Sequence, residues 1–248
     1  PLHVAPIKIS SWMGGDRDGN PNVTSIVTGE VLRLARWMAA DLYLRDIEEL
    51  LAQLSMSNCN EALQSQCPAD SSEPYRFVLR NLRERLTLTR DWAETDAPSH
   101  EDLILTSSDL TVPLMTCYDS LQDCGMSIIA DGLLKETLIR AHTFGVTLVE
   151  LDIRQSSDRH IELLDAITKY LELGSYQSWS EKARTDFLIQ ELESKRPLMP
   201  DTWVPEGEAA ETLKTFRLIG QNNGHGIASY IISMAKRPSD VPGVVLLL

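Results

Sequence analysis

Hydrophobic residues along this chain recur mostly at steps of three and four positions, the spacing of one face of a helix. The longest such segment runs from about Ser25 to Met56, and its apolar positions are Val31, Leu34, Ala35, Met38, Leu42, Ile47, Leu50, Leu51 and Leu54. The same pattern predicts further helices at about 74–95, 108–124, 128–143, 158–173, 178–194 and 206–221, and after Pro238. Residues 57–72 and 98–102 are polar and are predicted to be connecting segments. The chain is therefore expected to be mainly α.

Three short segments have the alternating, β-branched pattern of strands instead. They are residues 7–13, 146–155 and 227–234. The second and third are each followed by a helical pattern, which favours a few short parallel strands within a helical protein.

Arg154 lies near the end of the second predicted strand, directly before a helix that Ser156 can cap. In parallel α/β sheets and barrels, ligands bind at this carboxyl end of the strands. A guanidinium there can hold a phosphate or carboxylate through two hydrogen bonds, which a lysine cannot do. The structural alternative is an ion pair with Asp152 or Glu150, and the residues alone leave both interpretations open.

A run of eight residues after the first strand concentrates three glycines, two carboxylates and one guanidinium: Gly14, Gly15, Asp16, Arg17, Asp18, Gly19, Asn20 and Pro21. Glycine permits positive φ and lets the backbone approach a ligand. The run is not an EF-hand, because Pro21 stands where that loop needs glycine and Val27 where it needs glutamate. No Gly-Lys-Ser/Thr follows, which excludes a P-loop. We interpret it as an active-site loop, with a structural turn closed by ion pairs as the alternative.

Charge, hydropathy and the positions of cysteine and histidine exclude several classes of function. The 248 residues carry 36 acidic and 23 basic side chains, a net charge of −13, so nucleic-acid binding is not expected. No apolar run is long enough for a membrane span. The four cysteines show no metal-site spacing and are expected to be reduced, as in a cytoplasmic protein. No two histidines are four residues apart, so no helical metal pair is predicted, and His160 is expected to be structural.

Five motifs follow one another along the chain: SSWMGGDRDGNP at 10–21, LDIRQ at 151–155, SWS at 178–180, KRPL at 195–198, and ISMA with PSDV at 232–241. Together they resemble the phosphoenolpyruvate carboxylase family over essentially the whole length. Subunits of that family are several times longer. The chain also lacks an initiator Met and ends on an apolar run, so we expect a central piece of such a subunit.

The resemblance implies a helix-rich TIM-like (β/α) barrel, of which this chain is an incomplete piece. It divides the chain into a strand and active-site loop at 1–21, a helical bundle at 22–145 and β/α barrel units at 146–248. The implied reaction adds bicarbonate to phosphoenolpyruvate, through carboxyphosphate and an enolate, and gives oxaloacetate and phosphate. The implied partners are Mg²⁺ or Mn²⁺, the remainder of the subunit and a homotetramer.

The resemblance also suggests roles for particular residues. Arg154 resembles the arginine that grips the substrate phosphate, and Arg17 is a second candidate for substrate binding, positioned by Asp16 and Asp18. The remaining pocket-lining candidates are Trp12, Gly14, Gly15, Gly19, Asn20 and Gln155. The family's catalytic His and Lys segments and its metal carboxylates are absent from this sequence, so no catalytic residue or metal ligand is assigned here.

The piece alone is therefore expected to be inactive. The alternative function is a non-enzymatic helical scaffold, in which the arginines serve only ion pairs. Ser156, Gly29 and Pro242 depart from the residues usual in the family, and their effect on local loop geometry is not predicted.

Overall fold

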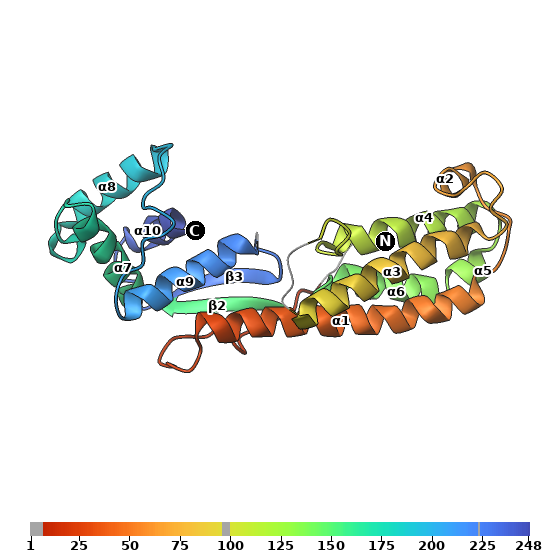
Figure 1. Cartoon of the computed structure of the whole chain (residues 1–248), viewed down its shortest axis with the longest axis horizontal. Helices are drawn as coiled ribbons and strands as arrows, with labels where there is room; N and C mark the ends of the chain where they lie inside the picture. Colours follow the sequence, from red (N-terminus) through yellow and green to blue (C-terminus); the bar gives the residue numbers. More distant parts are fainter. Residues whose placement is uncertain (1–6, 96–99, 223) are drawn as a thin grey trace. The chain divides into compact units, whose positions relative to one another are not determined.

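The computed structural model describes residues 7–95, 100–222 and 224–248 of the chain. These residues are mainly helical and form one small sheet of three strands (Figure 1). It divides into two compact units. The helical unit contains Leu32–Glu150 and the described residues up to Ser10, and the sheet unit contains Ser11–Val31 and Leu151–Leu248. The expectation of a mainly α protein with a few short strands is confirmed, and the predicted three-segment division stays a prediction.

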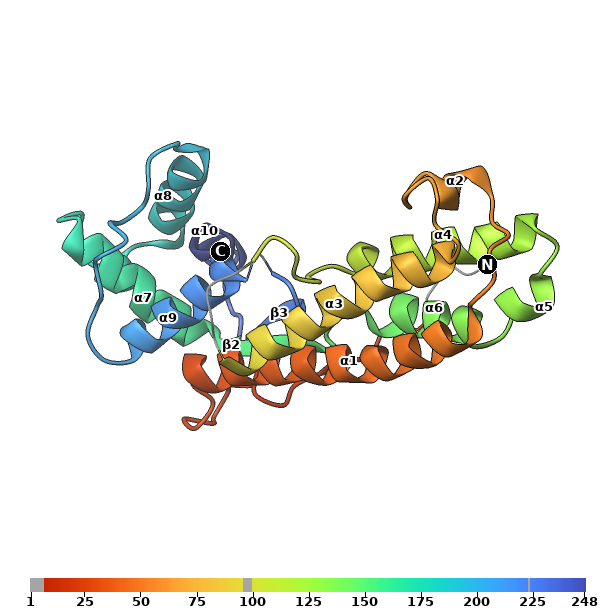
Figure 2. The same cartoon turned by 45° about the vertical axis from the view of Figure 1, so that its right-hand side comes forward.

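Four long helices run side by side in the helical unit, as the two views in Figures 1 and 2 agree. They are α1 (Ser25–Gln53, from Leu32 onward), α3 (Pro74–Thr95), α4 (Ser107–Asp123) and α6 (Leu133–Phe144). Their apolar faces meet in one core, whose fully buried members include Ile47, Leu50, Leu79, Leu82, Leu86, Leu110, Leu114 and Leu138. The period of three and four residues read from the sequence is the period of these buried positions.

Local chemistry explains where these helices begin and end. Pro74 occupies the first position of α3, where its missing N–H costs nothing. Thr106 caps α4 and forms a capping box with Asp109, each side chain binding the other residue's backbone N–H. Gly145 ends α6 with a φ of +62°, a value that glycine adopts without steric cost.

Two predictions in the helical unit need correction. The segment 57–72 is not all loop, because Asn60 caps a short helix, α2 (Glu61–Gln64), by accepting a hydrogen bond from the N–H of Leu63 at 3.0 Å. The helix predicted at 128–143 is two helices, α5 (Ser127–Ala130) and α6. Gly132 separates them, since its ψ of −137° lies far from helical values.

The three strands of the sheet unit are ordered β1 (Ser10–Ser11), β2 (Glu150–Ser156) and β3 (Ile227–Ser233). Strands β2 and β3 are parallel, with Ile153 opposite Tyr230 and Ser156 opposite Ser233. The helices of this unit are α7 (Ser157–Tyr170), α8 (Glu181–Glu193), α9 (Glu208–Gln221) and α10 (Asp240–Leu247), with a short 3₁₀ turn, Tyr176–Ser178. Helices α7 and α9 contribute to the core that buries Ile153 of β2.

The strands are shorter than the patterns predicted. The strand expected at 7–13 is reduced to two residues, because the backbone turns at once: the carbonyl of Trp12 accepts hydrogen bonds from the N–H groups of Gly15 and Asp16. The strand expected at 146–155 begins only at Glu150, because Leu148 has a φ of +60° and lies in a turn. The pattern identified both strand positions but not where the turns interrupt them.

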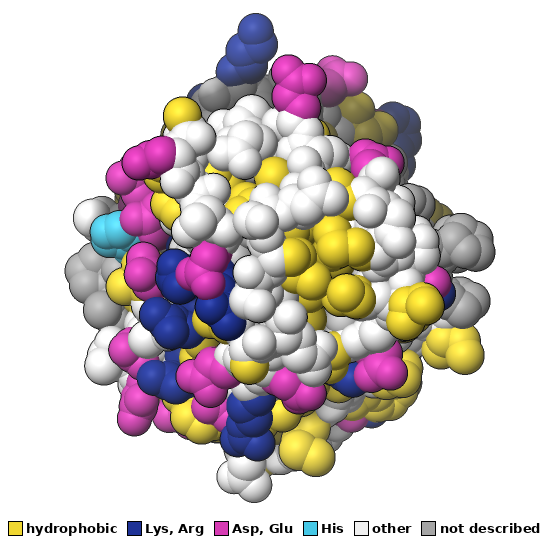
Figure 3. Space-filling model, turned by 90° about the vertical axis from the view of Figure 1, so that its right-hand side faces the viewer, with side chains coloured by type: hydrophobic (Ala, Val, Ile, Leu, Met, Phe, Trp, Pro, Cys, Tyr) yellow, Lys and Arg dark blue, Asp and Glu magenta, His cyan; other side chains and the backbone are white. Residues whose placement is uncertain are grey.

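Charged side chains of the helical unit pair with one another. Figure 3 views the side on which α2 and α5 lie in Figure 1, and there basic and acidic side chains lie next to each other. Arg76 and Arg80 both bind Glu73, at 2.5 and 3.0 Å.

All four cysteines are free thiols, as expected. None of the helices within the described ranges combines the length and apolar character needed to cross a membrane.

Candidate functional site

Two glycines of the loop lie so close to neighbouring atoms that no side chain fits there, Gly15 against β2 and Gly14 against α1. A Cβ on Gly15 would lie 2.1 Å from the carbonyl oxygen of Asp152. A Cβ on Gly14 would lie 2.5 Å from Cγ2 of Val31, and the φ of Gly14 is +84°. Gly15 therefore permits the close approach of two backbones, and Gly14 permits a positive φ beside the Val31 side chain.

Two backbone hydrogen bonds attach this loop to β2 near the carboxyl end of the strand. The N–H of Arg17 donates to the carbonyl of Arg154, and the N–H of Arg154 donates to the carbonyl of Gly15, both at 2.9 Å. They form a parallel bridge between Asp16 and Arg154. Bridged residues point their side chains to the same side, so Asp16 and Arg154 come together although 138 positions separate them.

Arg154 is held by the loop on two sides. Its Nε donates to Oδ1 of Asp16 at 2.8 Å and its Nη2 to Oδ2 at 3.0 Å. The guanidinium lies over the Trp12 ring, 4.7 Å from the ring centre. Its hydrogen bond to Asp16 raises the pKa of Arg154, so the side chain is a permanent cation. About a quarter of the side chain (27%) remains exposed, and Nη1 has no hydrogen-bond partner in the part of the chain that the structure describes.

Trp12 connects this arginine to the strand below it. Its Nε1 donates to Oδ2 of Asp152 at 3.1 Å, and Asp152, which is buried, also accepts a hydrogen bond from Ser229 on β3. The indole is therefore fixed at its polar edge, while its face supports Arg154. The sequence alternation placed Asp152 and Arg154 on one side of the strand, but the role of Trp12 as the link between them was missed.

Arg17 has a different environment. Its side chain is buried, Nη1 donates to the carbonyl of Gly15 at 3.1 Å, and Nη2 donates to Oγ1 of Thr28. Burial lowers the pKa of Arg17 from its ordinary value. The expectation that Asp16 and Asp18 position Arg17 is wrong: Asp16 binds Arg154, and the nearest oxygen of Asp18 is 3.8 Å from Nη2 of Arg154.

A polar cavity of about 760 Å³ lies beside the loop. Its lining residues come from the loop, the two residues just before α1, the end of β2 and the first turns of α7 and α9: Arg17, Gly19, Asn20, Pro21, Val23, Thr24, Gln155, Ser156, Asp158, Arg159, Glu162, Glu208, Glu211 and Thr212. Arg17, Gly19, Asn20 and Gln155 are predicted site residues. Arg154 is not among the residues that line this cavity, so of the two predicted substrate-binding arginines only Arg17 lines it.

The contact of Arg17 with substrate stays a prediction. Its Nε is buried without a hydrogen-bond partner among the described residues, while the other two nitrogens have internal acceptors. Thr28, one of these acceptors, was not predicted. The only signal for it in the sequence is the spacing of Thr24 and Thr28, one helical turn apart at the start of α1.

His160 lies in an aromatic cluster with Phe216 and Tyr230. Its Nε2 is 2.8 Å from the hydroxyl of Tyr230, and burial lowers the pKa of His160 to about 4. The imidazole is thus neutral at physiological pH, which agrees with the structural role expected for it.

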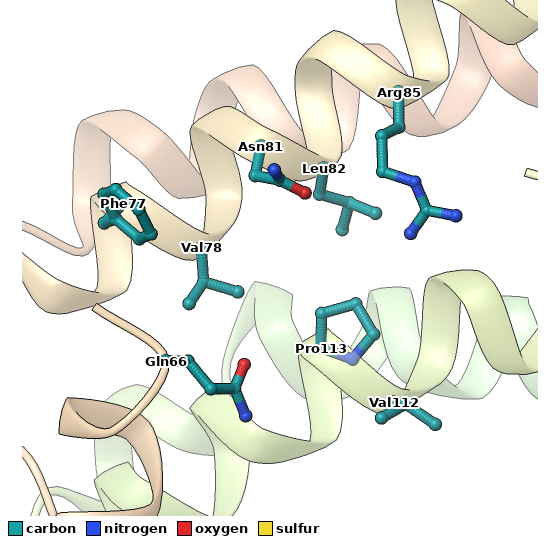
Figure 4. Close-up of a pocket in the computed structure, with 8 residues that line it drawn as sticks. All are labelled: Gln66, Phe77, Val78, Asn81, Leu82, Arg85, Val112 and Pro113. Carbon is teal, nitrogen blue, oxygen red and sulfur yellow. The ribbon is translucent and has the colours of Figure 1, made fainter. Parts of the chain in front are cut away.

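The helical unit has clefts of its own with less chemistry. One of about 300 Å³ lies between α3 and α4 (Figure 4), where Asn81 and Arg85 on α3 face Val112 and Pro113 on α4. The guanidinium of Arg85 already donates to the carbonyl of Asp102 at 3.1 Å. Another cleft, of about 330 Å³, lies between α1 and α6 and is mostly apolar. Its Arg140 is paired with Asp46 and Glu136, at 2.5 and 3.0 Å, so the basic side chains of both clefts are bound to groups of the helical unit itself.

No group of three His, Cys, Asp or Glu side chains within residues 7–95, 100–222 and 224–248 is arranged to hold a metal ion. Asp16 and Asp18, the carboxylates nearest to the candidate site, face Arg154 instead. The described residues therefore offer no preformed site of three or more such ligands.

Comparison with known proteins places this geometry in a family. The family described as phosphoenolpyruvate carboxylase matches residues 1–248. Phosphoenolpyruvate carboxylases of Pseudomonas paraeruginosa and Pseudomonas aeruginosa are 54% and 53% identical over 252 residues, and that of Marinomonas sp. is 51% identical. These alignments cover 100% of this chain and 29% of each relative, so the chain spans less than a third of their length. Because the match covers all of its residues, this chain belongs to the phosphoenolpyruvate carboxylase family.

Proposed function

We propose that this chain is part of an enzyme that forms oxaloacetate and phosphate from phosphoenolpyruvate and bicarbonate. Membership of the family and the names of the relatives support the reaction. The single observation that carries the local role is the exposed, oriented guanidinium of Arg154 near the carboxyl end of β2. In this proposal Arg154 binds the phosphate group of phosphoenolpyruvate.

The chemistry suits a fixed cation at this place. When bicarbonate attacks the phosphoryl group, negative charge spreads over the phosphoryl oxygens and the departing enolate oxygen. A guanidinium that is already oriented stabilises this charge without having to reorganise as the reaction proceeds. The half-buried setting of Arg154 strengthens that interaction relative to bulk water.

The proposal assigns the remaining parts of the reaction to other regions of the protein. The ligands of Mg²⁺ or Mn²⁺ are proposed to lie outside this chain, as are the catalytic His and Lys segments. The TIM-like barrel is proposed to be completed by further strands beside β1, β2 and β3. A homotetramer and a cytoplasmic location are likewise proposals from the family.

The test is oxaloacetate formation by the full-length protein and its Arg154→Ala variant. Removing one preorganised electrostatic contact of this kind lowers kcat/KM by about 10²- to 10³-fold. Arg154→Lys is expected to recover only part of the loss, because an ammonium cannot form two parallel hydrogen bonds. Arg45→Ala is the matched control, since it removes a 72% exposed guanidinium paired with Asp41.

Each outcome decides between the two candidate functions. An active parent with a large loss in Arg154→Ala, and little change in Arg45→Ala, supports both the reaction and the phosphate role. An active parent with an unaffected Arg154→Ala variant would keep the reaction and discard Arg154. An inactive full-length protein would favour the helical scaffold. The 248-residue chain by itself is expected to show no turnover, and measurable turnover would refute that part of the proposal.

A further inference from the structure

We infer that Asp16 is a positioning residue for Arg154: it occupies one edge of the guanidinium and directs the other edge toward the bound phosphate. The inference rests on the proposed phosphate role of Arg154 and adds a residue that acts only through that arginine. It is drawn from three observations: the two parallel hydrogen bonds between the Asp16 carboxylate and the Arg154 guanidinium, the stacking of that guanidinium on Trp12, and the part of the Arg154 side chain that remains exposed.

A guanidinium has two edges that can each form a pair of parallel hydrogen bonds. The side edge presents Nε and Nη2, and the end edge presents Nη1 together with the second N–H of Nη2. Asp16 takes the side edge, with one carboxylate oxygen on Nε at 2.8 Å and the other on Nη2 at 3.0 Å. The end edge of Arg154 therefore remains for an anion, and a phosphate fits it with two of its oxygens.

The plane and direction of that end edge are determined by groups that are themselves fixed. Asp16 belongs to the parallel bridge with β2, and its Oδ1 also accepts the N–H of Asp18 at 3.2 Å. Trp12 lies under the guanidinium plane and is fixed to buried Asp152. A long side chain with several rotatable bonds is thus reduced to one orientation before substrate arrives, which lowers the ordering cost of binding.

Asp18 provides a natural comparison. It is in the same loop and has the same charge, but its nearest oxygen is 3.8 Å from Nη2 of Arg154, outside hydrogen-bond distance. Any effect of Asp18 on Arg154 is therefore electrostatic only. Comparing the two aspartates separates the contribution of the two hydrogen bonds to Arg154 from the contribution of negative charge in the loop.

The two effects of Asp16 on the reaction have opposite signs. Its charge repels a phosphate dianion and so weakens ground-state binding, while its hydrogen bonds orient the cation for the transition state. Losing the carboxylate therefore leaves substrate binding nearly unchanged and impairs the chemical step. Misplacement of a catalytic contact by about 1 Å can cost up to about 10²-fold in rate, so we expect the defect in kcat and not in KM.

The experiment is a double-mutant cycle in the full-length protein with Asp16→Asn, Arg154→Ala and both together. Asp16→Asn is expected to lower kcat by about 10- to 100-fold and to change KM for phosphoenolpyruvate by less than about 3-fold. In the Arg154→Ala background, the same substitution should change kcat by less than about 2-fold, because a positioning residue has nothing left to position. Asp18→Asn is the comparison within the loop and should lower kcat clearly less than Asp16→Asn does, since it breaks no hydrogen bond to the guanidinium. Asp186→Asn is the control that should leave activity unchanged, because it removes an exposed carboxylate on α8 that is paired with Lys182.

The outcomes separate this inference from the proposed function. A large loss in Arg154→Ala, with an Asp16→Asn loss that persists undiminished in the double variant, would overturn the positioning role and leave the phosphate role intact. Equal losses in Asp16→Asn and Asp18→Asn would also overturn it, because charge alone would then explain both. A harmless Arg154→Ala would overturn both proposals. If circular dichroism shows that Asp16→Asn does not fold, Asp16→Glu replaces it in the double-mutant cycle. Glutamate keeps the carboxylate but moves it by one methylene.

Discussion

Replacing Gly15 by alanine tests whether the loop's close approach to β2 holds the candidate site together. The added Cβ would lie 2.1 Å from the carbonyl oxygen of Asp152, whereas ordinary contacts begin at 3.4 Å. The loop and strand must therefore separate by about 1 Å, and backbone atoms on both sides prevent an easier adjustment. The separation acts directly on the two backbone hydrogen bonds that flank Asp16.

The cost follows from what the separation breaks. The bonds from Arg154 N–H to Gly15 and from Arg17 N–H to Arg154 contribute about 1 kcal/mol each. The steric strain of the added methyl group contributes about 1–3 kcal/mol more, because backbone atoms on both sides resist the adjustment. We therefore expect Gly15→Ala to destabilise the sheet unit by about 3–5 kcal/mol, less a few tenths for the reduced freedom of the unfolded chain.

The assay is urea unfolding of the chain followed by circular dichroism, with Gly19→Ala as the control. Gly19 has a φ of +72°, but a methyl group added there would have no heavy atom of the described residues within 4 Å. Alanine at this position therefore meets only left-handed backbone strain, about 1–2 kcal/mol. A Gly15→Ala variant that is no less stable than Gly19→Ala would refute the reasoning, because the close contact would then carry no energetic weight.

Two further predictions concern stability alone. Burial holds the pKa of His160 at about 4, whereas the unfolded chain binds this proton near pH 6.5. As the pH falls, the unfolded chain is therefore protonated before the folded one. The stability present above about pH 6.5 is lost between about pH 6.5 and 4, and the loss is about 2 kcal/mol at pH 5. Urea unfolding at about pH 7.5 and about pH 5 should show this loss in the parent but not in His160→Gln, and equal pH dependence in both would contradict it. Thr106→Ala removes the capping box of α4 and should cost about 1 kcal/mol, against almost none for exposed Ser107→Ala; equal thermal stability of the two variants would count against the cap.

Helices were predictable here where one face is buried and a terminus has its own chemistry. The segment 74–95 satisfies both conditions, with Pro74 at its start and Leu79, Leu82 and Leu86 on its buried face, and it was predicted with the observed bounds. The break at Gly132 was missed because the apolar period continues on both sides of it, so the hydrophobic pattern alone carries no sign of a change in backbone direction.

The candidate site was predictable in its parts but not in its pairing. The β-turn-α pattern located Arg154 near a strand end, and the glycines indicated a close backbone approach. Which carboxylate binds which arginine depends on register between segments 138 positions apart, and a shift of one residue exchanges the side chains on each face. Asp16 was therefore assigned to its neighbour Arg17 rather than to Arg154.

That exchange changes how the charged run of the loop is understood. Within a strand-like bridge, adjacent residues point to opposite sides, so Asp16 and Arg17 cannot form the local ion pair that their adjacency suggested. Arg17 turns inward to Thr28 and the Gly15 carbonyl, where it fixes the loop's own backbone. Asp16 turns the other way and fixes a cation that the strand supplies. The loop thus uses its own arginine to fix its backbone, while its aspartate binds the arginine of the candidate site. An ordinary turn closed by exposed ion pairs would have required neither the buried guanidinium of Arg17 nor the two glycines in contact with neighbouring atoms.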